Sequence, residues 1–252
     1  WEMLYVPALG RFLALSHQTP IVRYWPAPQP REPLEVSPPL RILAVVANPR
    51  GVQPLKVEEE WARLRQALGG LEKAGSIVLE RLPSATVGAL LDRLRDRERG
   101  VHVLHFVGHG VFNADTSEGG LVFEKEAGDK QVVPAAKLAT MLHNHPSLRL
   151  AFLNACEGAK GGRREPFAGV AQKLVQQGVP AVVAMQVAVT DRAAVDLAHE
   201  FYEALADYYP VDAALTQARV RVQVSGNELE WATPVLFSRA ADNALFRRSG
   251  AD

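Results

Sequence analysis

The chain has 252 residues, and its 28 lysine and arginine residues balance 28 aspartate and glutamate residues. Zero net charge gives no electrostatic signature of a protein that binds nucleic acid or an anionic membrane. The single cysteine excludes an intrachain disulfide, a zinc site of paired cysteines and a cysteine-held iron–sulfur cluster. With no signal peptide and no apolar run near the ~20 residues of a membrane span, we expect a cytoplasmic protein.

The first 40 residues differ in composition from the rest. Seven of the 17 prolines fall between Pro20 and Pro39, and proline removes a backbone donor and favours extended structure. We expect residues 1–40 to hold a short strand pair and an extended connector; an ordered strap across the domain surface is the alternative. Because the chain opens on Trp1, we interpret this segment as the link to an upstream region, rather than as a start from which an initiator or tag was removed.

Residues 41–252 alternate between uniformly apolar strands and amphipathic helices, and we assign them to one domain. Strands are expected at 41–47, 77–79, 101–107, 148–153, 180–185 and 234–237, with a hairpin within 111–133. Helices are expected at 61–71, 87–94, 134–143, 166–177, 191–207 and 211–224. This order predicts an α/β domain whose mainly parallel sheet is covered by helices on both faces.

Two reactive side chains follow the ends of predicted strands, where working sites of such sheets lie. His109 stands between Gly108 and Gly110 after one strand, and Cys156 follows another strand 47 residues later. A cysteine in front of a helix favours the thiolate, a neighbouring imidazole can exchange protons with it, and the amides of Cys156 and Gly110 offer an oxyanion hole. The alternative is a small buried cysteine and a structural histidine, and spacing alone leaves both interpretations open.

Several sequence blocks resemble one known family. They are His105–Gly110, Leu153–Gly158, Gln177–Met185, Phe201–Tyr202 and Trp231–Leu236. Across about residues 41–246, they resemble the CHAT branch of the caspase–separase superfamily. The resemblance implies a caspase-like three-layer α/β/α sandwich and a cysteine endopeptidase with a dyad of His109 and Cys156. His105 is the competing imidazole, which we interpret as a core residue because no glycine follows it.

The resemblance also suggests residues of a substrate pocket. The segment Val189–Asp191 is similar to a separase pattern in which an acidic residue meets a basic substrate side chain, although Val187 and Ala188 replace the pattern's Trp and first Asp. Asp191 could instead cap a helix. Asp115 is a second acidic candidate, and Asn154 stands where caspases place a glutamine that lines the pocket. We therefore favour cleavage after a basic residue.

Two other features admit plainer explanations. The loop 158–166 is glycine-rich and basic, so it is either a site of self-cleavage after Arg163 or Arg164 or an exposed loop without a role. His143 and His145 could form a metal pair, but histidine near a helix C-terminus is a common dipole partner, so no metal is predicted. The chain has no phosphate-binding glycine motif, so no cofactor is expected.

The leading functional hypothesis is a cysteine peptidase that cleaves a specific protein partner. By resemblance, it would act in bacterial signalling or defence under an attached sensor or scaffold region, with no direct contact to nucleic acid or membrane. The rival hypothesis is a catalytically idle CHAT-like interaction module, against which the retained His and Cys argue. A third hypothesis, a cysteine-dependent hydrolase of small molecules, requires a pocket closed to polypeptide.

Overall fold

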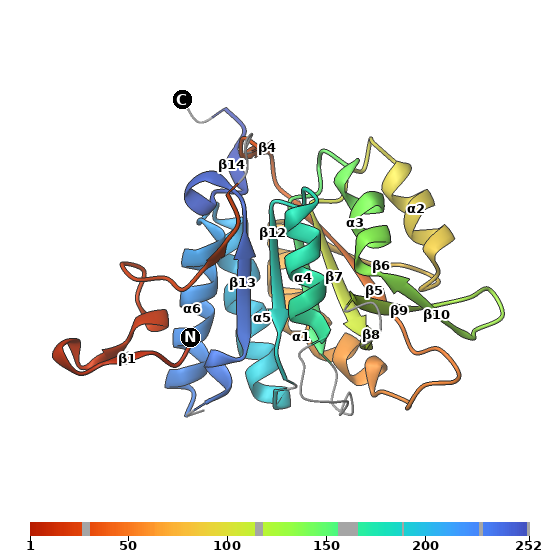
Figure 1. Cartoon of the computed structure of the whole chain (residues 1–252). Helices are drawn as coiled ribbons and strands as arrows, with labels where there is room; N and C mark the ends of the chain where they lie inside the picture. The colour runs from red at the N-terminus through yellow and green to blue at the C-terminus, as the bar shows by residue number, and fades with distance from the viewer. Residues whose placement is uncertain (27–30, 114–117, 156–165, 188, 227–228, 251–252) are drawn as a thin grey trace.

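A computed structural model describes residues 1–26, 31–113, 118–155, 166–187, 189–226 and 229–250 (Figure 1). Its central sheet has seven strands in the order β3-β13-β12-β11-β7-β5-β6. Their bounds are β3 (Arg23–Tyr24), β5 (Leu40–Val46), β6 (Ile77–Arg81), β7 (Val103–Gly108), β11 (Leu150–Ala155), β12 (Ala181–Met185) and β13 (Pro234–Ser238). The five strands from β12 to β6 are parallel, and β13 runs antiparallel to β12.

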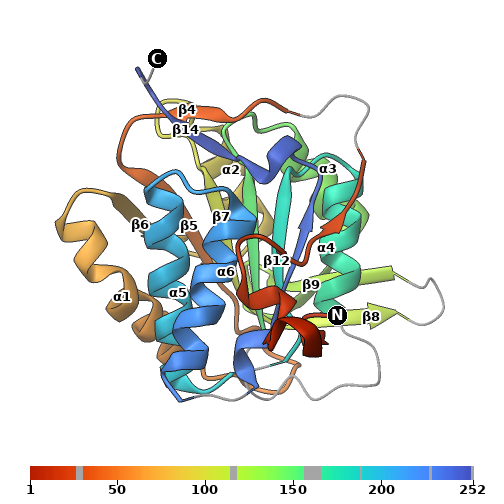
Figure 2. The same ribbon diagram turned by 90° about the vertical axis from the view of Figure 1, so that its left-hand side faces the viewer.

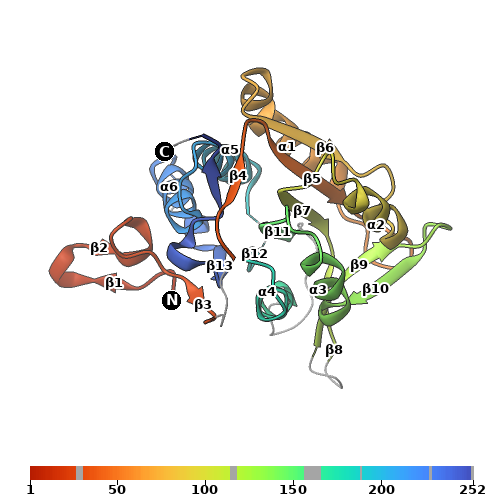
Figure 3. The ribbon, with the colours of Figure 1, turned by 90° about the horizontal axis from the view of Figure 1, so that it is seen from above.

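Helices cover both faces of this sheet (Figure 3). On one face lie α1 (Val57–Lys73), α5 (Asp191–Ala206) and α6 (Val211–Val224); on the other lie α3 (Ala135–His143) and α4 (Pro166–Gln176). A further helix, α2 (Val87–Arg95), follows β6. Every residue of β7 and β12 is buried, as expected of strands sandwiched between two helix layers. The three-layer α/β/α sandwich with a mainly parallel sheet is therefore confirmed.

A second, antiparallel sheet follows the histidine turn. It consists of β8 (Gly110–Asn113), β9 (Glu118–Glu124) and β10 (Lys130–Pro134). The expected hairpin corresponds to β9 and β10, and β8 adds an edge strand to it. Because β8 begins directly after His109, this small sheet fixes where the chain leaves β7.

The described part of the first 40 residues packs on the domain. The antiparallel pair β1 (Tyr5–Val6) and β2 (Arg11–Phe12) lies near the N-terminus, which Figure 2 shows in front of the sheet near α6. The Phe12 ring lies 5.0 Å from the ring of Trp231, in the short helix Glu230–Ala232 that follows α6. Strand β3 extends the central sheet next to β13. Beyond the prolines, β4 (Leu34–Val36) pairs with β14 (Phe246–Arg248) near the C-terminus. These contacts attach the described parts of residues 1–40 to the rest of the domain.

An aromatic cluster fills the space between the sheet and α5. The His105 ring stacks on Phe152 at 4.9 Å, and its Nδ1 lies 2.7 Å from the Tyr202 hydroxyl. Burial lowers the pKa of His105 from 6.5 to about 3, so the imidazole stays neutral at physiological pH. His105 is thus a core residue, as interpreted from the sequence.

Acidification should destabilise the fold through this histidine. Between pH 6.5 and about 3 the unfolded chain binds a proton that folded His105 excludes, so the free energy of unfolding falls as pH falls. The contribution is at most about 1.4 kcal/mol per pH unit. Urea unfolding of His105→Gln at pH 7, 6 and 5 should show a shallower pH dependence than wild type. His17→Gln, at an exposed histidine, should retain the wild-type slope; equal slopes in all three proteins would contradict the assignment.

Candidate active site

The parallel strands β7, β11 and β12 are neighbours, and all three end at the lower edge of the sheet in Figure 1. In the register of β7 and β11, Gly108 lies beside Ala155. In sequence, His109 follows Gly108 and Cys156 follows Ala155. The residues directly before His109 and Cys156 are therefore neighbours across the two strands. His109 is described by the structure, whereas Cys156 lies outside the described residues.

The His109 imidazole is buried, with 7% of its surface exposed, and one nitrogen is held by the backbone. Its Nε2 lies 2.7 Å from the carbonyl oxygen of Gln53, in the segment between β5 and α1. A carbonyl oxygen can only accept, so Nε2 carries the hydrogen. In the neutral ring, Nδ1 is then the nitrogen with a free lone pair. His109 can therefore accept a proton at Nδ1 while Gln53 fixes the orientation of the ring.

The glycines beside His109 are required by close packing. A Cβ on Gly108 would lie 3.1 Å from the Ala47 carbonyl oxygen, and one on Gly110 would lie 2.9 Å from the Phe167 ring. Phe167 is itself buried in the first turn of α4. The absence of both side chains thus lets the histidine turn pass between β5 and α4.

The pairing of β8 with β9 directs the Gly110 amide away from that sheet. The Val122 amide donates to the His109 carbonyl at 3.0 Å, which identifies residues 109 and 122 as a hydrogen-bonded pair of the antiparallel ladder. The next pair, Gly110 with Leu121, is therefore of the non-hydrogen-bonded kind. Since β8 is the edge strand of this sheet, the Gly110 N–H points to the side on which the described residues place no further strand.

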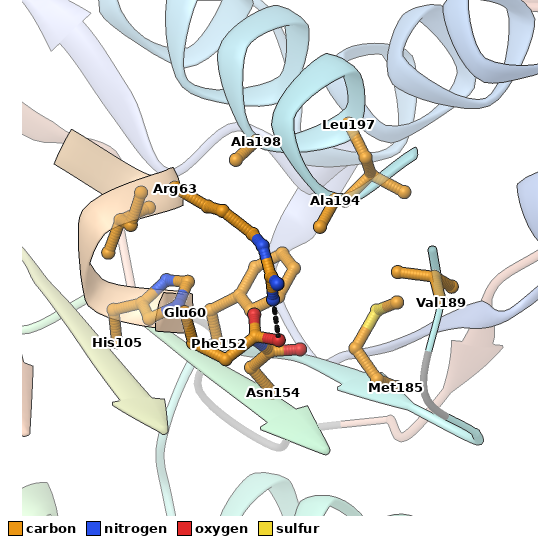
Figure 4. A pocket seen from close by; sticks show the side chains of 11 residues that line it. Glu60, Arg63, His105, Phe152, Asn154, Met185, Val189, Ala194, Leu197 and Ala198 are labelled. Atoms are coloured by element: carbon orange, nitrogen blue, oxygen red, sulfur yellow. Dashed lines mark hydrogen bonds and ion pairs between the residues drawn. The ribbon is translucent and has the colours of Figure 1, made fainter. Parts of the chain in front are cut away.

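Acidic residues surround one arginine near the same sheet edge, and Figure 4 shows one of them, Glu60, beside Arg63. Arg63 of α1 contacts Glu60 at 2.6 Å, Glu59 at 3.1 Å and Asp191 at 2.7 Å. Asn154, at the end of β11, donates to the Glu60 carboxylate at 3.4 Å. Glu59 also pairs with Lys56 at 3.6 Å, so two positive and three negative charges leave this group at −1 when all are ionised. Burial raises the pKa of Glu60, and Arg63 opposes that rise.

These side chains border a narrow pocket between the sheet, α1 and α5, with a cavity volume of about 30 Å³. Glu60, Arg63 and Asn154 line it, together with apolar side chains of both helices. Asp191 lies outside the lining, with 71% of its side chain exposed, at the first residue of α5. Its neighbour Thr190 is the N-cap residue, so Asp191 does not cap the helix as the sequence alternative proposed.

Asn154, which the sequence suggested for a substrate pocket, lines this cavity beside Glu60 and Arg63, two residues that no sequence motif pointed to. In sequence, Glu60 is one of three consecutive glutamates in the first turn of a helix, where acidic residues commonly balance the helix dipole. Only the packing of α1 against α5 shows that Glu60 points to the end of β11. Asp115 and nearly all of the loop 158–166 lie outside the described residues.

The part of the chain that the structure describes contains no group of three His, Cys, Asp or Glu side chains able to hold a metal ion. His143 is the last residue of α3 and is exposed. Among the same residues, no helix is both long and apolar enough to span a bilayer.

Replacing Gly110 should disturb the histidine turn. Gly110→Ala places a methyl group against the buried Phe167 ring, which should lower the free energy of unfolding by about 1–3 kcal/mol. Gly169, in the same helix as Phe167, has no atom within 4 Å of its Cβ position. Gly169→Ala should therefore raise stability by up to about 1 kcal/mol. Urea unfolding followed by circular dichroism measures both; a neutral Gly110→Ala would refute the tight packing.

Comparison with known proteins places the chain in a family. The solved structures similar to it include the Arg-specific cysteine proteinase gingipain R, at 15% identity and a TM-score of 0.47, over 83% of this chain and 48% of that one. They also include separase in the separase–securin complex of Saccharomyces cerevisiae, at 18% identity and a TM-score of 0.48, over 82% of this chain and 12% of that one. The chain thus spans about half of the first protein and an eighth of the second.

No curated protein matches it. The CHAT domain model matches residues 1–238, so this chain belongs to the CHAT domain family.

Proposed function

We propose that this CHAT domain is a cysteine endopeptidase in which Cys156 is the nucleophile and His109 its general base. The observation that carries the proposal is the register that sets Gly108 beside Ala155, one residue before each member of the pair. The bond from Nε2 to Gln53 further supports it, because it leaves Nδ1 as the basic nitrogen.

The proposed reaction follows from these groups. His109 takes the thiol proton at Nδ1, and the Cys156 thiolate attacks the carbonyl carbon of the scissile peptide bond. The Gly110 N–H, which the β8–β9 ladder leaves unused, and the Cys156 N–H donate to the oxygen that becomes negative. His109 then gives its proton to the leaving amine, and water hydrolyses the remaining thioester. Throughout, the Gln53 carbonyl stabilises the positively charged imidazolium.

The substrate of the proposed peptidase is a protein partner, and a basic residue precedes the cleaved bond. The acidic group around Arg63 supports this preference, because its net charge of −1 attracts a cation. The pocket is too narrow for a guanidinium as it stands, so Arg63 has to move aside when substrate enters. The substrate cation would then replace Arg63 as the partner of Glu60, with Asn154 beside it and Asp191 at the mouth of the pocket.

We include in this proposal that an attached sensor or scaffold region controls the peptidase.

The nucleophile can be tested directly because the chain has a single cysteine. Labelling by iodoacetamide should slow about 10- to 100-fold in His109→Ala, since the thiol loses its base. His143→Ala, at an exposed histidine distant from this edge, is the matched control. Cleavage of a diverse peptide library should disappear in both Cys156→Ala and His109→Ala. Cleavage that survives Cys156→Ala would refute the nucleophile, and fast labelling with no cleavage, even with the full-length parent and its activator, would favour the interaction module.

The pocket can be tested by comparing two glutamates that hold the same arginine. Glu60→Gln should lower kcat/KM for substrates with arginine before the cleaved bond by about 10- to 100-fold, because one charge-assisted contact is lost. Glu59 also binds Arg63, but it lies outside the pocket lining and is half exposed. Glu59→Gln should therefore change kcat/KM by less than about threefold. An unaltered preference for arginine in Glu60→Gln would exclude this pocket as the specificity site.

A further inference from the structure

The opposite edge of the sheet, the upper edge in Figure 1, gathers arginines from distant parts of the chain. Arg149 precedes β11, and its carbonyl accepts from the Ala181 amide at 3.2 Å. Arg239 follows β13, and its amide donates to the Pro180 carbonyl at 2.9 Å. Arg149, Pro180 and Arg239 therefore lie next to one another along this edge, at the ends of the adjacent strands β11, β12 and β13. Arg31, from the proline-rich segment, joins them beside the end of α3.

Two of these arginines use only part of their hydrogen-bonding capacity. Arg31 donates one Nη to the His143 carbonyl at 2.6 Å, and Arg239 donates one Nη to the carbonyls of Val175 and Gln176 at 3.1 and 3.4 Å. Each guanidinium has five N–H groups, so most of them remain without an acceptor among the residues that the structure describes. Arg149 is only 9% exposed, and its buried Nε has no partner. A buried guanidinium nitrogen without an acceptor is costly.

The positive charge of this cluster is not balanced by the protein. Within the described residues, no carboxylate forms an ion pair with any of the three arginines. Burial and Arg239 lower the pKa of Arg31, and burial and Arg31 lower that of Arg149. The C-terminal ends of α3 and α4 supply roughly half a negative charge each, about −1 against +3. A net charge of about +2 therefore remains.

A pocket opens at this cluster, with a cavity volume of about 430 Å³. Arg31 and Arg239 line it, together with the exposed His143, the half-buried Gln177 and Gly178, and the buried Pro180. This volume lies in the range of small-ligand sites, roughly 300–1,000 Å³. The pocket thus combines unused N–H donors, excess positive charge and room for more than a single water molecule.

We propose that Arg31, Arg239 and Arg149 form a binding site for a small polyanion that carries phosphate or carboxylate groups. Arg31 and Arg239 contact the anion through their free N–H groups, and Arg149 adds charge next to Arg31. Phosphate and carboxylate oxygens match the planar fork of a guanidinium, which makes arginine the preferred side chain for both. The site lies at the amino ends of the parallel strands and the carboxyl end of β13, at the edge of the sheet opposite His109, and is independent of the proposed catalysis.

Isothermal titration calorimetry of the whole chain with pyrophosphate and, separately, with citrate tests the site at ionic strength held constant with sodium chloride. Tighter binding of pyrophosphate assigns a phosphate ligand, and tighter binding of citrate assigns a carboxylate ligand. Arg31→Gln and Arg239→Gln should each weaken the tighter anion about 10- to 100-fold. Arg95→Gln, at an exposed arginine of α2, should bind like wild type. Neither readout depends on peptidase activity, so failure of the proposed function leaves it intact.

Arg149→Met provides a second measurement. Removing a buried charge without a partner should raise the melting temperature in anion-free buffer, while the anion should then stabilise this variant less than wild type. A melting temperature lowered by Arg149→Met would contradict an unbalanced charge. No heat of binding with either anion, or equal affinity in wild type and Arg31→Gln, would overturn the site.

Discussion

The parallel alignment of β7 with β11 is the constraint on which the rest of the site depends. Both strands are buried between helix layers, so their apolar side chains fix the register against slippage. A shift of one residue would turn Phe152 and Asn154 from the α1–α5 side to the α4 side. The same shift would separate Gly108 from Ala155. The geometry of the histidine turn, the pocket and the aromatic cluster around His105 all follow from this one pairing.

The pattern of apolar strands and amphipathic helices predicted the central sheet because each long element repeats its signal several times. It also predicted that His109 and Cys156 follow strand ends, since a strand end is marked by glycine and polar residues. The pairing of β4 with β14 could not be foreseen, because three-residue strands carry no periodicity. Glu60 was missed for a related reason: its place in the pocket depends on how α1 packs against α5, and no local pattern encodes that packing.

The zero net charge of the chain conceals a separation between the two edges of the sheet. At the carboxyl ends of the strands, three carboxylates face two cations, Arg63 and Lys56. At the opposite edge, Arg31 and Arg239 donate to backbone carbonyls at the ends of α3 and α4, and Arg149 adds a third positive charge. The helices contribute to this polarity, because α3 and α4 run antiparallel to the strands and end near the arginines. The composition counts charges over the whole chain, so only the fold reveals that the two edges differ in charge.

The bond between His109 and the Gln53 carbonyl has a consequence for how such a site can vary. A main-chain oxygen is present whatever amino acid occupies position 53, so substitution there leaves the acceptor in place. The quantity that evolution must preserve is the course and length of the segment between Val46 and Val57, since an insertion or deletion would carry the oxygen away from the ring. The tautomer of His109 thus depends on the spacing between β5 and α1 and not on the side chain at position 53.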